Sequence, residues 1–171
     1  WAKLNNLKQA AKTMNFLTEH GISSYGELES KLNAVSARRD TAHAEIKRIE
    51  SRSAELTLVM KHAGTYRQLK PIYDRYRKSN DKEKFLRGHE SEIILFEAAA
   101  RELKRLGAVP LPTTESMKKE LANLTAEKER LLAEYKAART EAQEYDTVKQ
   151  NVDALLTVPK EQEQQRRHEL E

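Results

Sequence analysis

The 171-residue chain contains no cysteine, five glycines and four prolines. The absence of cysteine excludes disulfide bonds, thiolate zinc sites and cysteine nucleophiles. Glycine and proline are so scarce that sandwiches, barrels and βαβ folds, which need many turns, are disfavoured. No uncharged apolar run approaches the roughly 18 residues of a membrane-spanning helix, so we expect no membrane insertion.

Charged residues, in contrast, make up 34% of the chain, whereas apolar residues make up 38%. This composition indicates long helices that each bury a narrow apolar stripe. We therefore predict an all-α protein, and we expect it in the cytoplasm. Because the sequence begins with Trp1 instead of methionine, we also expect it to be a segment of a longer protein.

Two stretches show the spacing of coiled coils, in which apolar residues recur at alternating intervals of four and three. In the first seam eight of ten positions are apolar, and in the second seam ten of twelve are. The first seam consists of Leu28, Leu32, Val35, Arg39, Ala42, Ile46, Ile49, Ser53, Leu56 and Met60. The second consists of Met117, Leu121, Leu124, Lys128, Leu131, Tyr135, Ala138, Ala142, Tyr145, Lys149, Val152 and Leu156.

Capping signals set the expected helix ends. Ser24 and Glu27 have the spacing of a capping box, Gly64 is the expected end of the first long helix, and Pro159 that of the second. We therefore predict five parts: an N-terminal helix at 1–21, long helices at 24–63 and 114–157, a helical insertion at 64–113, and a polar tail at 158–171.

Two shorter helices complete the prediction. One ends at Gly21, and the other runs from about Asp81, its N-cap, to Leu106. The apolar side of the first is Leu4, Leu7, Ala11, Met14 and Leu17. That of the second is Phe85, His89, Ile93, Phe96, Ala100 and Leu103.

A long helix with so narrow a stripe needs a partner along its length. Because both seams have similar lengths within one chain, we favour a monomeric antiparallel coiled-coil hairpin, closed by the insertion, over a parallel homodimer. The register that places Met60 opposite Met117 pairs Leu56 with Leu121, Ile46 with Leu131, Ala42 with Tyr135, Val35 with Ala142 and Leu32 with Tyr145.

Positive charge gathers in residues 61–88, where nine basic and three acidic residues give +6, whereas the rest of the chain carries −2. Basic residues interleaved with aromatics suit a phosphate backbone with stacked bases. The candidate DNA-binding residues are Lys61, Arg67, Lys70, Tyr73, Arg75, Tyr76, Arg77, Lys78, Lys82, Lys84 and Arg87. Two alternatives stay open: a solvated charged surface over a small core of tyrosines, and a protein-binding surface.

The sequence contains no recognisable catalytic motif. Tyr66, Tyr73 and Tyr76 share one face of a helix, but a DNA-cleaving tyrosine also needs a metal or acid partner, and the histidines lack ligand spacing. The run from Asp81 to Lys84 matches an acid-x-lysine nuclease signature only superficially, because Asp81 is better explained as an N-cap. We therefore predict a segment that is not an enzyme and holds no cofactor or metal.

The runs LKPIYDRYRKSNDKEKF (69–85) and EIILFEAA (92–99), followed by a second long charged helix, resemble the C-terminal helical region of relaxases. Relaxases are the mobilisation nucleases of conjugative plasmids and integrative elements in Gram-positive bacteria. The similarity extends from about Leu4 to Leu156. The tyrosine nucleophile and metal-binding histidine cluster of the family's nuclease domain do not occur here.

The resemblance therefore implies a non-catalytic accessory module of a DNA-nicking enzyme. Such a module is expected to contact single-stranded or transfer-origin DNA near the nick through the basic insertion. The alternative is a structural coiled-coil arm that docks proteins of the transfer complex.

Overall fold

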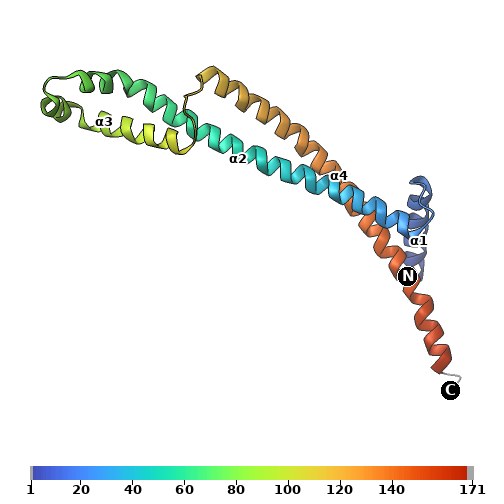
Figure 1. The fold of residues 1–171 in the computed structure, drawn as a ribbon. Coiled ribbons are helices and arrows are strands. Elements are labelled where there is room, and N and C mark those ends of the chain that lie inside the picture. Colours follow the sequence, from blue (N-terminus) through green and yellow to red (C-terminus); the bar gives the residue numbers. More distant parts are fainter. Residues whose placement is uncertain (1, 169–171) are drawn as a thin grey trace. The chain divides into compact units, whose positions relative to one another are not determined.

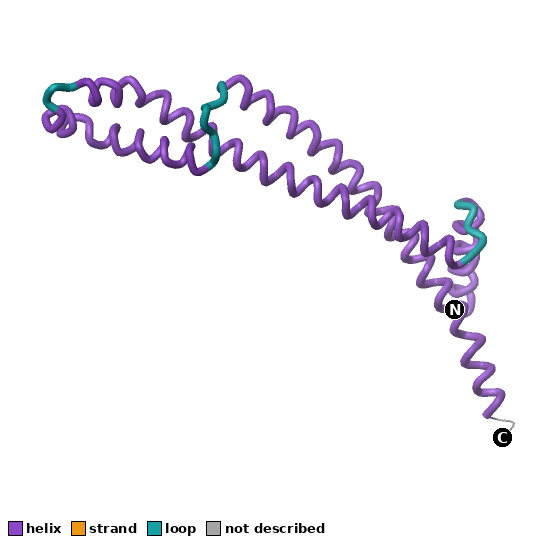
Figure 2. Tube along the Cα trace, in the orientation of Figure 1, coloured by secondary structure: helices purple, strands orange, loops and turns teal. Residues whose placement is uncertain are grey.

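A computed structural model describes residues 2–168 of the chain, with side chains described for residues 6–157. Within this range the chain forms four helices and no strand: α1 (Ala2–Glu19), α2 (Tyr25–Lys78), α3 (Lys82–Arg105) and α4 (Thr114–His168), as Figures 1 and 2 show. The prediction of an all-α protein is confirmed. The chain divides into unit 1 (Trp1–Ala44 with Leu131–Glu171) and unit 2 (Glu45–Arg130).

Side chains cap the helix starts, largely as the sequence predicts. The Ser24 hydroxyl accepts a hydrogen bond from the Glu27 N–H (3.2 Å) at the start of α2. The Glu27 carboxylate turns to Ser23, whose N–H (2.7 Å) and hydroxyl (2.9 Å) both donate to it, so the reciprocal half of the capping box involves Ser23. Asp81 is the N-cap of α3, where its carboxylate accepts from the Lys84 N–H at 2.9 Å.

Two glycines end helices in the left-handed conformation that favours glycine. Gly21 has φ of +61° and follows α1, and Gly107 has φ of +66° and follows α3. In each case the next residue donates back to a carbonyl five residues earlier, Ile22 to Leu17 at 2.8 Å and Ala108 to Leu103 at 2.9 Å. The end of the first helix at Gly21 is therefore confirmed.

The predicted helix ends at Gly64 and Pro159 are wrong, because α2 continues to Lys78 and α4 continues to His168. A glycine inside a helix costs only about 1 kcal/mol relative to alanine, and packing on both sides of Gly64, by the buried Ala63 and the stacked Tyr66, opposes a break there. Beyond Pro159 the sequence is rich in Glu, Gln and Arg, which favour helix. Side chains of the predicted tail at 158–171 lie outside the described residues.

Unit 1 has a core shared by α1, α2 and α4. Its buried members are Ile22, Leu28, Val35, Ala138, Ala142, Tyr145 and Val148, with Phe16, Leu17, Leu32 and Val152 packed against them. Val35 and Ala142, and likewise Leu32 and Tyr145, fall in this one cluster, as the proposed register requires. Arg38 pairs with Glu141 and Lys149 pairs with Glu29 at 3.7 Å, so α2 and α4 are antiparallel within this unit.

The predicted apolar side of α1 is wrong at Leu7 and Met14, which are 67% and 59% exposed, whereas Leu17 packs on the core as predicted. The other packed residues are Thr13 and Phe16, and the Phe16 ring lies edge-on to Tyr145 at 5.2 Å. An aromatic ring buries more apolar area than leucine or methionine, which explains why the face that carries Phe16 is preferred. The side chain of Leu4 lies outside the described residues.

Unit 2 has a second core, formed by α2, α3 and the start of α4. Its buried members are Leu56, Val59, Ala63, Leu103, Ala108 and Met117, with Met60, Tyr66, Leu106, Leu111, Leu121 and Leu124 packed against them. Both predicted pairs of this unit, Leu56 with Leu121 and Met60 with Met117, lie in this cluster. On α3, Ile93, Phe96 and Leu103 are buried as predicted, and Ala99 joins them.

Every first-seam residue is buried or half-buried, and so are all second-seam residues except Leu156, which is 56% exposed. Ile46 and Leu131 are buried members of unit 2 and unit 1, respectively. The heptad spacing therefore identifies which faces of α2 and α4 are covered.

We expect Leu28→Ala to lower the free energy of unfolding by about 2–5 kcal/mol, because Leu28 is 1% exposed and truncation leaves a cavity in unit 1. Leu7→Ala, the matched control on α1, should change it by less than about 0.5 kcal/mol because Leu7 faces solvent. Urea unfolding followed by circular dichroism measures both. Equal losses in the two variants would contradict the α1 face described above.

A second prediction concerns pH. The Tyr25 hydroxyl donates to Asp153 at 2.7 Å, and this bond, followed by the nearby Lys149, lowers the pKa of Asp153 below its ordinary value of 3.8. A carboxyl with a lowered pKa stabilises the fold above its ordinary pKa, and this contribution disappears as the pH falls through the lowered value. We expect Tyr25→Phe to reduce Tm most near neutral pH and progressively less below about pH 4. Thermal scans of both proteins across this range test it; a pH-independent difference would contradict the assignment.

Candidate nucleic-acid interface

The basic stretch predicted from the sequence forms one continuous part of unit 2. We call residues 61–88 the basic tip: it comprises the last part of α2, the short turn after Lys78, and the start of α3. Figure 1 shows this turn in green, where α2 and α3 reverse direction. The tip is thus built on two helices joined by three residues, 79–81.

All nine cationic side chains of the tip are exposed. Two have protein partners: Lys70 pairs with Asp74 at 2.9 Å, and Arg67 donates to the Thr114 hydroxyl at 2.6 Å and to the Pro112 carbonyl. Within the described part of the chain, the side chains of the other seven make no hydrogen bond or ion pair. These seven, which we call the unpaired cations, are Lys61, Arg75, Arg77, Lys78, Lys82, Lys84 and Arg87.

Two of the three carboxylates of the tip are engaged locally. The hydrogen bond between Lys70 and Asp74 raises the pKa of Lys70, so this lysine stays protonated. The Asp74 carboxylate forms its ion pair with Lys70. Asp81 caps α3. Because Asp81 keeps its negative charge as a cap, the seven unpaired cations are opposed within the tip by Asp81 and Glu83.

Part of this charge also serves the helices. Arg75, Arg77 and Lys78 lie in the last turn of α2, where cations interact favourably with the negative end of the helix dipole. Each such contact contributes about 0.3–1 kcal/mol at an exposed site. A structural role of this kind and a role in binding an external anion are compatible, because the charged groups remain in solvent.

The aromatic rings of the tip pack against one another between α2 and α3. Tyr66 and Tyr73 both stack on Phe96, with ring centroids 4.7 and 4.2 Å away. Tyr76 lies 6.0 Å from Tyr73 and 6.2 Å from Phe85. The tyrosines thus form the small tip core that the sequence left open as an alternative. Of the eleven candidate residues, Tyr73 and Tyr76 are half-buried in this core, whereas the nine cations are at the surface.

A local break interrupts α3 beside the turn. His89 has non-helical angles, φ −140° and ψ 25°, directly after Gly88. Its Nδ1 lies 3.5 Å from the Glu92 carboxylate, and its ring is 4.6 Å from Phe85. A hollow of about 340 Å³ lies beside it, lined by Ser79, Asp81, Lys84, Phe85, Gly88 and His89. Asp81 in this lining disfavours the hollow as an anion site, so the cations on the outer surface are the better candidates.

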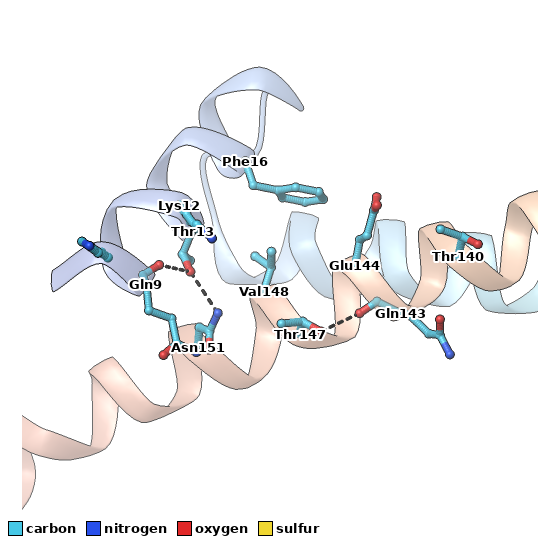
Figure 3. Close-up of a pocket in the computed structure, with 11 residues that line it drawn as sticks. Gln9, Lys12, Thr13, Phe16, Thr140, Gln143, Glu144, Thr147, Val148 and Asn151 are labelled. Carbon is cyan, nitrogen blue, oxygen red and sulfur yellow. Dashed lines mark hydrogen bonds between the residues drawn. The ribbon is translucent and has the colours of Figure 1, made fainter. Parts of the chain in front are cut away.

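Unit 1 contains a second, larger concavity, which Figure 3 shows between α1 and α4. This groove has a volume of about 810 Å³. At its base the Gln9 amide donates to Asn151 at 2.7 Å, and the Asn151 amide donates to the Thr13 hydroxyl at 3.1 Å. The Thr13 hydroxyl in turn donates to the Gln9 carbonyl at 3.0 Å and is part of a side chain only 2% exposed.

Sequence reasoning missed this polar network. Gln9, Thr13 and Phe16 share one face of α1, but polar residues on that face carry no hydrophobic period, and their partner Asn151 is 138 residues away from Thr13. The hydrogen bonds of the network satisfy one another, so the groove explains how α1 is held on α4. It offers no reactive group.

Other chemistry finds little support in the residues described. No three of their His, Asp and Glu side chains converge as metal ligands would. None of the helices, over the range described, combines the length and apolar character needed to cross a membrane. Compared with protein-family models, with curated proteins and with solved structures, the chain gives no match.

We expect Thr13→Val to lower the free energy of unfolding by about 1–2 kcal/mol, because it removes the acceptor of the Asn151 amide while keeping the shape of the side chain. Thr18→Val is the matched control: the exposed Thr18 hydroxyl bonds only to the Met14 carbonyl of its own helix. Urea unfolding gives both values, and hydrogen exchange should show faster exchange in α1 for Thr13→Val. Equal effects of the two substitutions would contradict the role assigned to the network.

Proposed function

We propose that this chain is a non-catalytic helical module that contacts the phosphate backbone of DNA through the basic tip. The observation that carries the proposal is the set of seven unpaired cations gathered within residues 61–88. Some arginines and lysines elsewhere are engaged in ion pairs, as Arg38, Arg48, Arg52 and Lys128 are, but others, such as Lys118 and Lys119, are exposed and unpaired among the described residues. What distinguishes the tip is that its unpaired cations lie in a stretch of net charge +6, whereas the rest of the chain carries −2. Exposed cations without partners, in a stretch of residues with net charge +6, are suited to an external polyanion.

The physical basis is the release of counterions. Each phosphate neutralised by lysine or arginine frees condensed cations from the nucleic acid, and this makes association favourable without any reading of bases. The same mechanism makes binding weaken steeply as salt concentration rises.

We further propose that α2 and α4 form an antiparallel coiled-coil hairpin that carries the tip. Contacts inside each unit support this arrangement: Arg38 with Glu141 and Lys149 with Glu29 in unit 1, and Arg52 with Glu120 (2.8 Å) and Lys128 with Glu50 (2.7 Å) in unit 2. The seams of each unit are covered by the same chain, which favours a monomer over a parallel homodimer.

The resemblance to the C-terminal helical region of relaxases supports a place for this module beside a DNA-nicking nuclease in the cytoplasm. There, backbone contact would hold transfer-origin DNA near the nick without taking part in the chemistry. No catalytic residue is assigned to the chain, because the tyrosines at 66, 73 and 76 pack in the tip core and none has a cluster of metal ligands beside it among the described residues.

A second candidate function is a structural arm that docks a protein of the transfer complex. It is favoured by Ile94 and Leu95, adjacent residues of α3 that are 55% and 54% exposed. An Ile94→Ser/Leu95→Ser variant separates the two functions, since it should leave DNA binding unchanged and abolish capture of such a protein.

The test of DNA binding is removal of charge from the tip. We expect Arg75→Gln/Arg77→Gln/Lys78→Gln to weaken binding of a fluorescent DNA oligonucleotide by about 100-fold at roughly 100 mM salt, because three phosphate contacts are lost. Fluorescence anisotropy measures the affinity, and a thermal scan checks that α2 is intact.

The matched control is Lys118→Gln/Lys119→Gln/Arg139→Gln, which removes the same charge from exposed positions of α4. It should weaken binding far less. If both variants weaken binding equally, the effect comes from the net charge of the protein and the proposed interface is contradicted. Absence of binding by the unaltered protein at low salt would also contradict it.

A further inference from the structure

We infer that the basic tip is a binding surface for double-stranded DNA and prefers it to single-stranded DNA of the same sequence. This inference rests on the proposed function and narrows its substrate. The interleaved basic and aromatic residues of the sequence suggest that bases stack on the aromatic rings. The structure instead packs those rings against one another between α2 and α3, and the preference for a duplex follows from this placement.

Proteins that bind single strands without sequence preference combine a basic groove with aromatic side chains on which successive bases stack. The tip offers no such platform. Phe96 is 6% exposed and already stacks with both Tyr66 and Tyr73. Tyr76 and Phe85 are half-buried and lie 6.2 Å apart, and Phe85 also faces His89 at 4.6 Å. Opening any of these rings to a base would remove it from the interface between α2 and α3.

The cations, in contrast, are outside the tip core and open to solvent. They belong to helices, so their positions are fixed by backbones that cannot wrap around a flexible strand. From Lys61 to Lys78 the helix rises about 26 Å, at 1.5 Å per residue. A duplex carries one phosphate charge per roughly 1.7 Å of its axis, at fixed spacing, whereas a single strand carries fewer charges per length and must be ordered on binding.

Charge without stacking therefore favours the duplex. Counterion release is also larger for a duplex, with a slope of log K against log salt of about −0.9 per phosphate contact, compared with about −0.7 for single strands. The tip should consequently show both the higher affinity and the steeper salt dependence on double-stranded DNA.

The experiment uses the full chain with a fluorescein-labelled duplex of about 20 base pairs and with each of its two strands alone, at about 50, 100 and 200 mM KCl. We expect the duplex to bind at least about fivefold more tightly than either strand at roughly 100 mM salt, with the steeper slope. The tip variant Arg75→Gln/Arg77→Gln/Lys78→Gln should lose this duplex binding, whereas the α4 control should keep it.

A second variant, Tyr76→Leu, tests stacking directly, because leucine retains apolar packing but offers no ring to a base. Its affinities for the duplex and for both strands should stay within about twofold of those of the unaltered protein, provided that its thermal scan shows an intact fold. If that fold is lost, the comparison of duplex with single strands at three salt concentrations still decides the question.

The outcomes are distinguishable. Equal or tighter binding of single strands, or a selective loss of single-strand binding in a folded Tyr76→Leu protein, would overturn the preference for duplex while leaving the proposed DNA binding intact. Failure to bind either form at about 50 mM salt would overturn both. Duplex binding that survives in the tip variant would show that the preference belongs to another surface.

Discussion

The structure depends on the burial of two narrow apolar seams, one on α2 and one on α4, and neither helix could bury its seam alone. In a chain with 34% charged residues, α2 and α4 hold only one covered stripe each, and isolated helices of this kind are marginal in water. The covered positions are nearly closed to solvent, with Ile49 and Ala138 at 0% and Leu28 at 1% exposure. In unit 1, α1 packs on these two helices, and in unit 2 the tip begins within α2 itself.

Cations fill two different roles around that core. Lys128 and Lys149 stand in the second seam, where their stems are half-buried and their ammonium groups reach Glu50 and Glu29. Such side chains cover apolar surface while they keep their charge in water. The unpaired cations of the tip lie outside the seams and have no acidic partner within the described part of the chain. Residues 61–88 carry +6 whereas the rest of the chain carries −2, and this contrast in net charge is why the tip, and not the charged surface as a whole, is the candidate interface.

The sequence predicts structure well where a pattern of residues repeats along the chain, and poorly where a single residue determines a helix end or the packed face of a helix. The seams recur over many turns, so their faces were predicted correctly, and the caps at Ser24 and Asp81 depend only on neighbours three residues away. Gly64 is a single weak signal, outweighed by the packing of Ala63 and Tyr66. The face of α1 was wrong because the polar partner that fixes it, Asn151, is remote in the sequence. For the candidate site, the exposure of the cations can be predicted because lysine and arginine are rarely buried. The packing of the aromatic rings could not be predicted, because it depends on which faces of α2 and α3 contact each other.

The aromatic residues of the tip hold α2 and α3 together, and the cations of the tip face solvent on these two helices. Stacking of Tyr66 and Tyr73 on the buried Phe96 fixes α3 against α2, and this contact sets the spacing of the charged side chains that both helices carry. Under the proposed function, an aromatic residue contributes to DNA binding without touching DNA. A substitution that loosens the ring stack would weaken binding by letting the cations spread, and it would lower stability in parallel. Loss of affinity without loss of stability is instead the mark of a charge that contacts phosphate directly.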